Sequence, residues 1–314
     1  MFGRISLAAV LALGCGVLAA QAQSLRFGAG QQGSQNYGVN AALAQAIEAG
    51  TGTAVTVQSF GGATAFLPLL GSDELDMAAV VTPDLADALR GTGPFAGMAQ
   101  DKIKVVAPLL PSPVGLMVRA DSGIATIADL KGKRVAWGIP AQASLLPYVE
   151  GALANGGLTA AEVQQVPVAS VANGVQALVA GSVDATLFAL RGGAVVEADA
   201  ALGGIRWLPF DPSPEAVARM QALAPEAYLL PVGAGAGVVG VKADMDTMAY
   251  DYVLVARAGV PDATIAAIAT LLRDKTEIVA GSAPVLKAMT RDAVLRAYPG
   301  LPFHPAAQAV LTAR

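Results

Sequence analysis

Short apolar runs alternate along this chain with longer stretches in which apolar residues recur every three or four positions. In the first 81 residues, the apolar runs predict strands at 25–29, 54–60 and 76–81. The stretches between them, 38–49 and 62–70, have the spacing of amphipathic helices. A strand–helix–strand–helix–strand order is typical of the opening of a parallel sheet, so the pattern predicts an α/β fold.

The same rhythm returns in the middle of the chain. The pattern there predicts strands at 134–138, 165–168 and 184–190, and helices at 144–155 and 171–180. One short sequence pattern occurs in both regions. In both, a helix ends at Gly-Ser and an aspartate, Asp76 or Asp184, precedes the next apolar strand. Because there are only two copies, we expect two lobes of like topology and not a solenoid.

Two extended runs separate these regions, one at 105–118 with three prolines and one at 247–256 after a glycine-rich segment. We expect them to be crossovers that form a two-segment hinge between the lobes. The predicted lobe 1 is 23–114 plus 247–314, and the predicted lobe 2 is 115–246. Helices are expected over 262–279 and 283–297.

The N-terminus has the pattern of an export signal. Arg4 precedes an apolar stretch, and Ala20-Gln-Ala22 fits the small-x-small cleavage rule, so residues 1–22 are expected to be removed after Ala22 and the protein to be periplasmic. An uncleaved anchor is the alternative, and Leu13-Gly-Cys15 leaves lipidation of Cys15 open.

The composition of the chain restricts the kinds of chemical site and partner that it can have. Cys15 is the single cysteine and His304 the single histidine, so thiolate sites, histidine metal sites and histidine triads are disfavoured. Without Arg4, 19 basic residues face 24 acidic ones, a net charge of about −5 that argues against nucleic acid as a partner. We expect no metal, no cofactor and no catalytic residue.

Polar loops after the predicted strands are the candidate ligand site, because open α/β sheets bind ligands at the carboxyl ends of their strands. Gly28-x-Gly-x-x-Gly33 resembles a dinucleotide fingerprint, but strand 54–60 ends without the acidic residue that would hold a ribose. The loops of lobe 1 contribute the candidates Gln31, Gln32, Ser34, Tyr37, Gly62, Ala63, Thr64 and Thr82.

Lobe 2 contributes Trp137, Gln142, Ser144 and Arg191 as further candidates. Arg191 directly follows a predicted buried strand, where a guanidinium could grip a carboxylate. Three of them have a structural alternative: Trp137 as core, Ser144 as a helix N-cap and Arg191 as a solvated loop residue. Asp84 and Asp87 are interpreted as helix N-terminal charges.

Four phrases make the chain resemble the TAXI family, the solute-binding receptors associated with TRAP transporters. They are the glycine-rich first loop ending at Tyr37, the second loop Phe60-Gly-Gly-Ala-Thr64, the segment 122–135 and the tail Leu301-Pro-Phe-His304-Pro. The resemblance implies a bilobed, type II-like periplasmic binding protein that captures a small anionic or zwitterionic ligand (glutamate or dicarboxylate-like) and delivers it to TRAP permease subunits. Three ligand loops depart from the family pattern, Pro140-Ala-Gln-Ala-Ser144 among them.

Two other functions stay open at this point. One is a sensor-type binding module that signals to a membrane partner, and the other is an enzyme on the same scaffold. The candidate loops carry no histidine, cysteine or paired carboxylates, so we expect a receptor and not an enzyme. We also expect a monomer.

Overall fold

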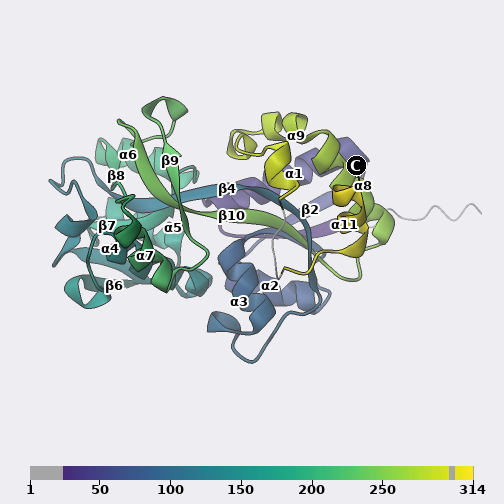
Figure 1. Ribbon diagram of the computed structural model, residues 1–314, viewed down its shortest axis with the longest axis horizontal. Coiled ribbons are helices and arrows are strands. Elements are labelled where there is room, and N and C mark those ends of the chain that lie inside the picture. The colour runs from purple at the N-terminus through teal and green to yellow at the C-terminus, as the bar shows by residue number, and fades with distance from the viewer. Residues whose placement is uncertain (1–23, 297–300, 314) are drawn as a thin grey trace, which may run out of the picture.

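The computed structural model describes residues 24–296 and 301–313, and these form two groups of elements bridged by two long strands (Figure 1). The predicted export signal and its cleavage site lie outside the described residues. Within the described part, no helix is both long and apolar enough to cross a membrane.

The first group opens with the predicted strand–helix alternation. Its three strands are parallel in the order β2-β1-β3, with β1 in the middle. The elements are β1 (Leu25–Ala29), α1 (Gln35–Thr51), β2 (Val55–Ser59), α2 (Ala63–Gly71), β3 (Met77–Val81) and α3 (Thr82–Arg90).

The second group repeats this order. Strand β5 pairs in parallel with β6 on one side and β7 on the other, as β1 does with β2 and β3. The elements are β5 (Arg134–Gly138), α4 (Leu146–Asn155), β6 (Gln164–Val168), α5 (Val171–Val179) and β7 (Ala185–Ala189). The prediction of two lobes of like topology is therefore confirmed.

Two long antiparallel strands, β4 (Ile103–Arg119) and β10 (Met245–Arg257), lie between the two groups and complete one sheet of order β2-β1-β3-β10-β4-β7-β5-β6. Both predicted extended runs are thus confirmed as strands. The predicted lobe boundaries, 114/115 and 246/247, fall inside these strands. Four elements of the second group were not predicted: α6 (Ala194–Leu202), β8 (Ile205–Trp207), α7 (Pro214–Leu223) and β9 (Tyr228–Val232).

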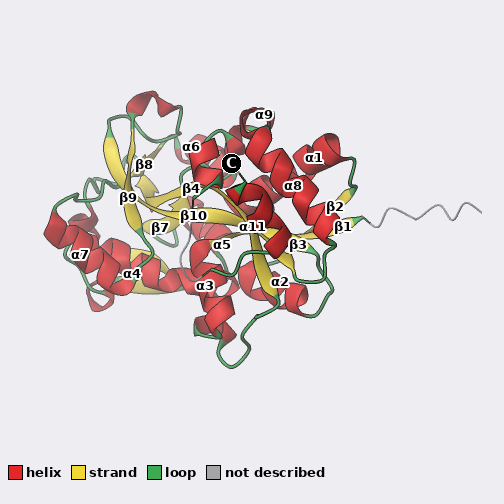
Figure 2. Ribbon diagram, turned by 45° about the vertical axis from the view of Figure 1, so that its right-hand side comes forward, coloured by secondary structure: helices red, strands yellow, loops and turns green. Residues whose placement is uncertain are grey.

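Helices flank the sheet (Figure 2). Strand β3 is apolar throughout because both of its faces are covered. All five residues of β3 are buried. Met77 and Ala79 pack in the same core as α1, whereas Ala78 and Val80 pack in a second core with α2 and α3. Successive strand residues point to opposite faces, so a strand covered on both sides loses the polar alternation of an exposed one.

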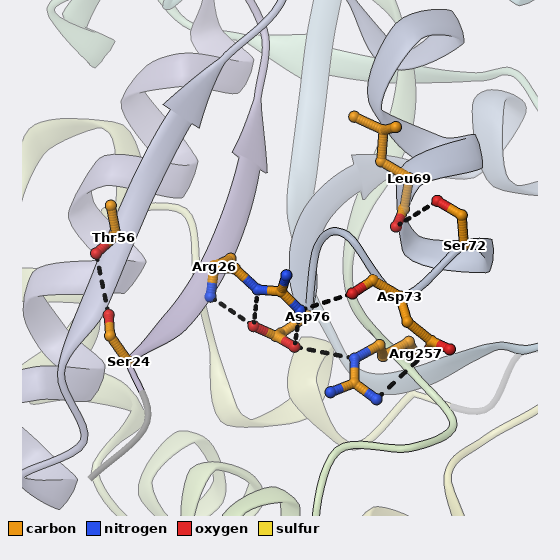
Figure 3. Close-up of polar contacts among 8 residues, drawn as sticks. All are labelled: Ser24, Arg26, Thr56, Leu69, Ser72, Asp73, Asp76 and Arg257. Carbon is orange, nitrogen blue, oxygen red and sulfur yellow. Dashed lines mark hydrogen bonds and ion pairs between the residues drawn. The ribbon is translucent and has the colours of Figure 1, made fainter. Parts of the chain in front are cut away.

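The aspartate before the last strand of each group makes the same contact (Figure 3 shows the first). Asp76 accepts hydrogen bonds from the Arg26 backbone and guanidinium at 2.8 and 2.9 Å, and Asp184 does the same with Arg134 at 2.8 and 3.2 Å. Asp76 also binds Arg257 at the end of β10, at 2.9 Å. The sequence pattern that the two lobes share therefore marks an ion pair that occurs in both of them.

The C-terminal region departs from the predicted helices. The expected helix 262–279 is broken at Lys275 into α8 (Asp262–Asp274) and α9 (Thr276–Ser282). The expected helix 283–297 is wrong, because Pro284 and the capping residue Thr290 interrupt it. Only short pieces form there, ahead of the last helix: η6 (Pro284–Leu286), α10 (Arg291–Val294) and α11 (Pro305–Thr312).

Five further 3₁₀ turns complete the described elements. They are η1 (Gly93–Phe95), η2 (Ile127–Leu130), η3 (Pro140–Leu145), η4 (Ala160–Glu162) and η5 (Ala234–Ala236). The turn η3 matters for function, because the expected helix 144–155 begins only at Leu146 and the residues before it stay in the loop that faces lobe 1.

Candidate functional site

A cavity of about 60 Å³ lies between the lobes at the carboxyl ends of β1, β3 and β7. This is the sheet edge at which α/β proteins bind ligands. Lobe 1 and β10 contribute Gly30, Ser34, Gln35, Asn36, Gly62, Ala63, Val81, Asp84, Val114, Tyr250 and Tyr252, and lobe 2 contributes Gln142, Leu145, Val171, Leu187, Phe188 and Ala189. The volume is that of a few water molecules or a compact ligand group.

The first turn of α1 forms one wall. Ser34 is the N-cap, and its hydroxyl accepts a hydrogen bond from the Tyr37 N–H at 3.1 Å. The preceding Gly33 has a φ of 85°, a conformation that favours glycine. The helix therefore starts three residues before the expected Gly38, and this brings Gln35 and Asn36 to the cavity.

The first turn of α2 forms the neighbouring wall, where Gly62 and Ala63 line the cavity. Gly62 lies directly against lobe 2. A Cβ at this position would meet the carbonyl oxygen of Ala141 at 2.1 Å and the Gln142 Nε2 at 2.3 Å. The close approach of the lobes therefore requires glycine at position 62.

Asp84 is the ionisable carboxyl of the cavity. It follows β3 in the first turn of α3 and is only 4% exposed. Burial raises the pKa of Asp84 to about 7, and Ser144 opposes this rise only in part. No hydrogen bond of normal geometry reaches the Asp84 Oδ1 or the Ser144 Oγ from any described residue.

Gln35 adds another unpartnered group. Its Oε1 accepts a hydrogen bond from the Ser112 hydroxyl at 3.1 Å, whereas its Nε2 is buried without a partner among the described residues. Buried polar atoms are normally paired, so a group of unpaired ones around one cavity indicates that a ligand or water completes them.

Among the described residues, several hydrogen bonds join the lobes, and three of them lie in the loops around the cavity. Ser170 donates to the Gln31 Oε1 at 2.8 Å, and the Gln142 Nε2 donates to the Gly61 carbonyl at 3.1 Å. The third runs from the Ala194 N–H to the Gly33 carbonyl at 2.9 Å. The cavity is therefore enclosed by direct contact between loops of both lobes.

The structure brings some of the sequence-predicted site residues together and leaves others apart. Ser34, Gly62, Ala63 and Gln142 line the cavity. Ser144 lies behind it, near enough to Asp84 to affect its pKa. Gln31 joins the lobes through Ser170, whereas Gln32 is exposed.

The remaining predicted residues do not line this cavity. Tyr37 is half-buried in α1, and Thr64 is half-buried with its hydroxyl unpartnered. Thr82 is buried and accepts a hydrogen bond from the Asp251 N–H at 3.4 Å, and Trp137 lies in the main core. Arg191 lines a different groove, with Gly192 and Pro284.

Sequence reasoning missed most residues of the cavity, among them Gln35, Asp84, Tyr250 and Tyr252. The interpretation of Asp84 as a helix N-terminal charge is right about its position but not about its environment, because it is buried instead of solvated. Its place three residues after a fully apolar strand was the signal that could have identified it. The tyrosines come from β10, far along the chain, and no local pattern marks them.

The electrostatic character of the cavity is set by acidic and aromatic groups. Its described lining contains no lysine, arginine or histidine. Burial, together with the nearby Asp84 charge, raises the pKa of both Tyr250 and Tyr252, so both phenols are neutral. Among the described residues, no group of three or more His, Cys, Asp or Glu could hold a metal ion.

Solved structures with the same fold include periplasmic binding proteins and a sensor domain that is similar to them. The structure of a periplasmic transporter is 13% identical over 86% of this chain and 87% of that chain, with a TM-score of 0.59. An ancestral arginine-binding protein bound to arginine is 15% identical over 82% and 96%, with a TM-score of 0.51. A histidine kinase sensor domain with similarity to periplasmic binding proteins is 16% identical over 85% and 97%, also at 0.51.

The sequence itself matches a family over nearly its whole length. The match runs from residue 27 to residue 312, and so covers both lobes and the two strands that bridge them. The chain belongs to the NMT1-like family.

Proposed function

We propose that this protein is an exported solute-binding receptor that captures a small organic acid or amino acid between its lobes and passes it to a TRAP-type membrane permease. One observation carries the binding role. Two buried polar atoms without a partner among the described residues, Gln35 Nε2 and Asp84 Oδ1, belong to the lining of one interlobe cavity, and a third, Ser144 Oγ of lobe 2, lies beside Asp84. Isolated buried polar groups are unfavourable, and a ligand bound between the lobes would satisfy them.

The first turns of two helices support a ligand with a carboxylate. Helices α1 and α2 both begin at the cavity, with Ser34 and Gly62 as their N-caps. Free N–H groups and the helix dipole favour an anionic group at such a position. This provides a carboxylate site without Arg191, which lies in another groove.

Export and delivery to a TRAP permease rest on the N-terminal pattern and on the resemblance to the TAXI family. Ligand binding and lobe closure are linked thermodynamically, so the closed form would present a distinct surface to the permease. A sensor role is the second candidate, because the same fold occurs in a histidine kinase sensor domain. The absence of paired carboxylates or a nucleophile–base pair from the cavity lining favours either role over catalysis.

Thermal unfolding against a panel of amino acids, dicarboxylates, oxo-acids and neutral solutes tests the binding role. A ligand at 100 times its dissociation constant should add about 2.7 kcal/mol of stability and raise Tm by several degrees. No response to any solute would refute a solute receptor. Uptake of the identified solute in a deletion strain then separates the two roles, since only a transport receptor is needed for uptake.

A further inference from the structure

The side chains of the cavity between the lobes restrict the chemistry of its ligand more narrowly than the fold does. Asp84 is 4% exposed and lines this cavity, and its Oδ1 accepts no hydrogen bond from any described residue. The other two buried aspartates of the described residues each pair with a guanidinium: Asp76 with Arg26 and Arg257, and Asp251 with Arg296. Asp84 is the buried aspartate whose arginine or lysine partner is missing among the described residues.

In the described part of the chain, no lysine, arginine or histidine lines the cavity or affects the pKa of Asp84. The titratable groups that influence it are Asp87 on its own helix, Tyr148 on α4, and Tyr250 and Tyr252 on β10. An aspartate or a tyrosine can carry no positive charge, so none of these groups can be a cationic partner. A second carboxylate placed beside Asp84 would be repelled, whereas a cation placed there would supply the missing partner.

The remaining walls suit an ammonium group. Tyr250 and Tyr252 bring aromatic rings to the cavity, and aromatic faces attract cations. Away from Asp84, the first turns of α1 and α2 offer backbone N–H donors, and the Gln35 Nε2, which has no partner among the described residues, is a further donor. The cavity thus has one acceptor end, at Asp84, and one donor end, at the two helix N-termini.

We propose that the protein selects a compact ligand with a protonated amine, which pairs with the Asp84 carboxylate, and that dicarboxylates without an amine are excluded. This inference rests on the proposed function and names its ligand class. An amino acid with a single carboxylate fits both ends of the cavity, with its amine at Asp84 and its carboxylate at the helix N-termini. The cavity volume of about 60 Å³ limits the ligand to a small one.

Matched probe pairs test the proposal on the wild-type protein. Titration calorimetry and thermal unfolding would compare alanine with lactate, γ-aminobutyrate with 4-hydroxybutyrate, and ethanolamine with ethylene glycol, with succinate and glutarate as dicarboxylates. We expect at least one amine to bind at least thirtyfold more tightly than its hydroxyl counterpart. Equal or tighter binding of the hydroxyl compound would overturn the assignment, and this comparison needs no mutant to fold.

Variants then locate the amine. Asp84→Asn keeps the shape of the side chain but not its charge, and should weaken binding of the best amine at least thirtyfold. Asp87→Asn is the control on the same helix, because the Asp87 carboxylate is bonded to Thr92 at 2.8 Å and does not line the cavity; it should change the affinity less than threefold. Unchanged affinity in Asp84→Asn would refute the role of Asp84.

The two proposals fail in different ways. Binding of dicarboxylates alone would overturn the amine assignment and leave the receptor function standing. No binding of any amine, acid or neutral solute would refute both.

Discussion

The side chain of Gln31 accepts a hydrogen bond from the Ser170 hydroxyl at 2.8 Å, although the two residues are 139 positions apart and belong to different lobes. Ser170 is also the N-cap of α5, where its hydroxyl accepts a hydrogen bond from the Asn173 N–H. The loop after β1 in lobe 1 is thereby tied to the start of a helix in lobe 2. The contact can exist only when the lobes are together, so its energy belongs to the closed form alone.

Replacing Gln31 by alanine should therefore weaken closure without weakening the fold. A neutral hydrogen bond contributes about 1 kcal/mol, so we expect ligand affinity to fall by up to about tenfold in titration calorimetry. The ligand would be the best solute of the thermal panel. Gln32→Ala is the matched control, because Gln32 is exposed and lines no part of the cavity. Equal affinities in the two variants would show that this contact does not contribute to closure.

A methyl group at position 62 should hold the lobes apart. The Cβ of Gly62→Ala would lie 2.1 Å from the Ala141 carbonyl oxygen of lobe 2, a contact that backbone atoms cannot relieve by a rotamer change. We expect more than a tenfold loss of ligand affinity and a larger radius of gyration in solution scattering with ligand, at unchanged apo Tm. In Gly61→Ala the nearest atom is 3.9 Å away, so that variant should close normally. Normal closure of Gly62→Ala would refute this packing.

Asp84 should make stability depend on pH in an unusual direction. Its pKa rises from the ordinary 3.8 to about 7 on folding, so between these values the folded protein holds a proton that the unfolded chain has released. Stability contributed by this group is therefore highest near pH 4 and decreases as the pH rises to about 7. The difference is at most roughly 4 kcal/mol, at 1.36 kcal/mol per pKa unit.

The variant Asp84→Asn removes this dependence. Denaturant unfolding should show it more stable than the wild type at pH 8 and close to the wild type at pH 4. A gap that shrinks with rising pH would contradict a buried, unpaired carboxyl at this position.

Asp76 should show the opposite pH dependence. Burial alone would raise its pKa, but hydrogen bonds from Arg26 and Arg257 outweigh burial and hold the pKa below its ordinary value. Its stabilising contribution is thus present at neutral pH and is lost as the pH falls through the ordinary range of a carboxyl. Asp76→Asn should lose about 3 kcal/mol at pH 7, measured by urea unfolding, and less at pH 3.

The equivalent aspartate of lobe 2 provides the comparison. The Asp184 side chain is 28% exposed against 5% for Asp76, and it has one arginine partner instead of two. Asp184→Asn should therefore be clearly milder. A larger loss in Asp184→Asn would contradict the importance of burial in this pair.

The ligand site predicted from the sequence includes Arg191, whereas the lining of the cavity in the structure does not. The sequence predicts a guanidinium that grips a carboxylate, whereas the structure has Arg191 in a groove with Gly192 and Pro284. We expect Arg191→Ala to change ligand affinity less than twofold. A tenfold loss in calorimetry would return Arg191 to the site and require the lobes to close differently around the ligand.

Local patterns in the sequence determined most of the architecture. The strand–helix alternation predicted both parallel halves, because apolar periodicity follows directly from the burial of strand and helix faces. Ser34 and Gly62, from the glycine-rich loops after β1 and β2 that the sequence singles out, line the cavity. The repeated Gly-Ser and aspartate phrase indicated the second lobe, since the same ion pair recurs in it.

Only the tertiary structure decided which side chains line the cavity. Asp84 looked like an ordinary helix-capping charge, and nothing within its own helix shows that Tyr250 and Tyr252 bury it from a strand that begins about 160 residues later. Burial and the absence of a cationic partner both depend on neighbours that are distant in sequence. They determine the ionisation of a carboxyl, although no local pattern encodes them.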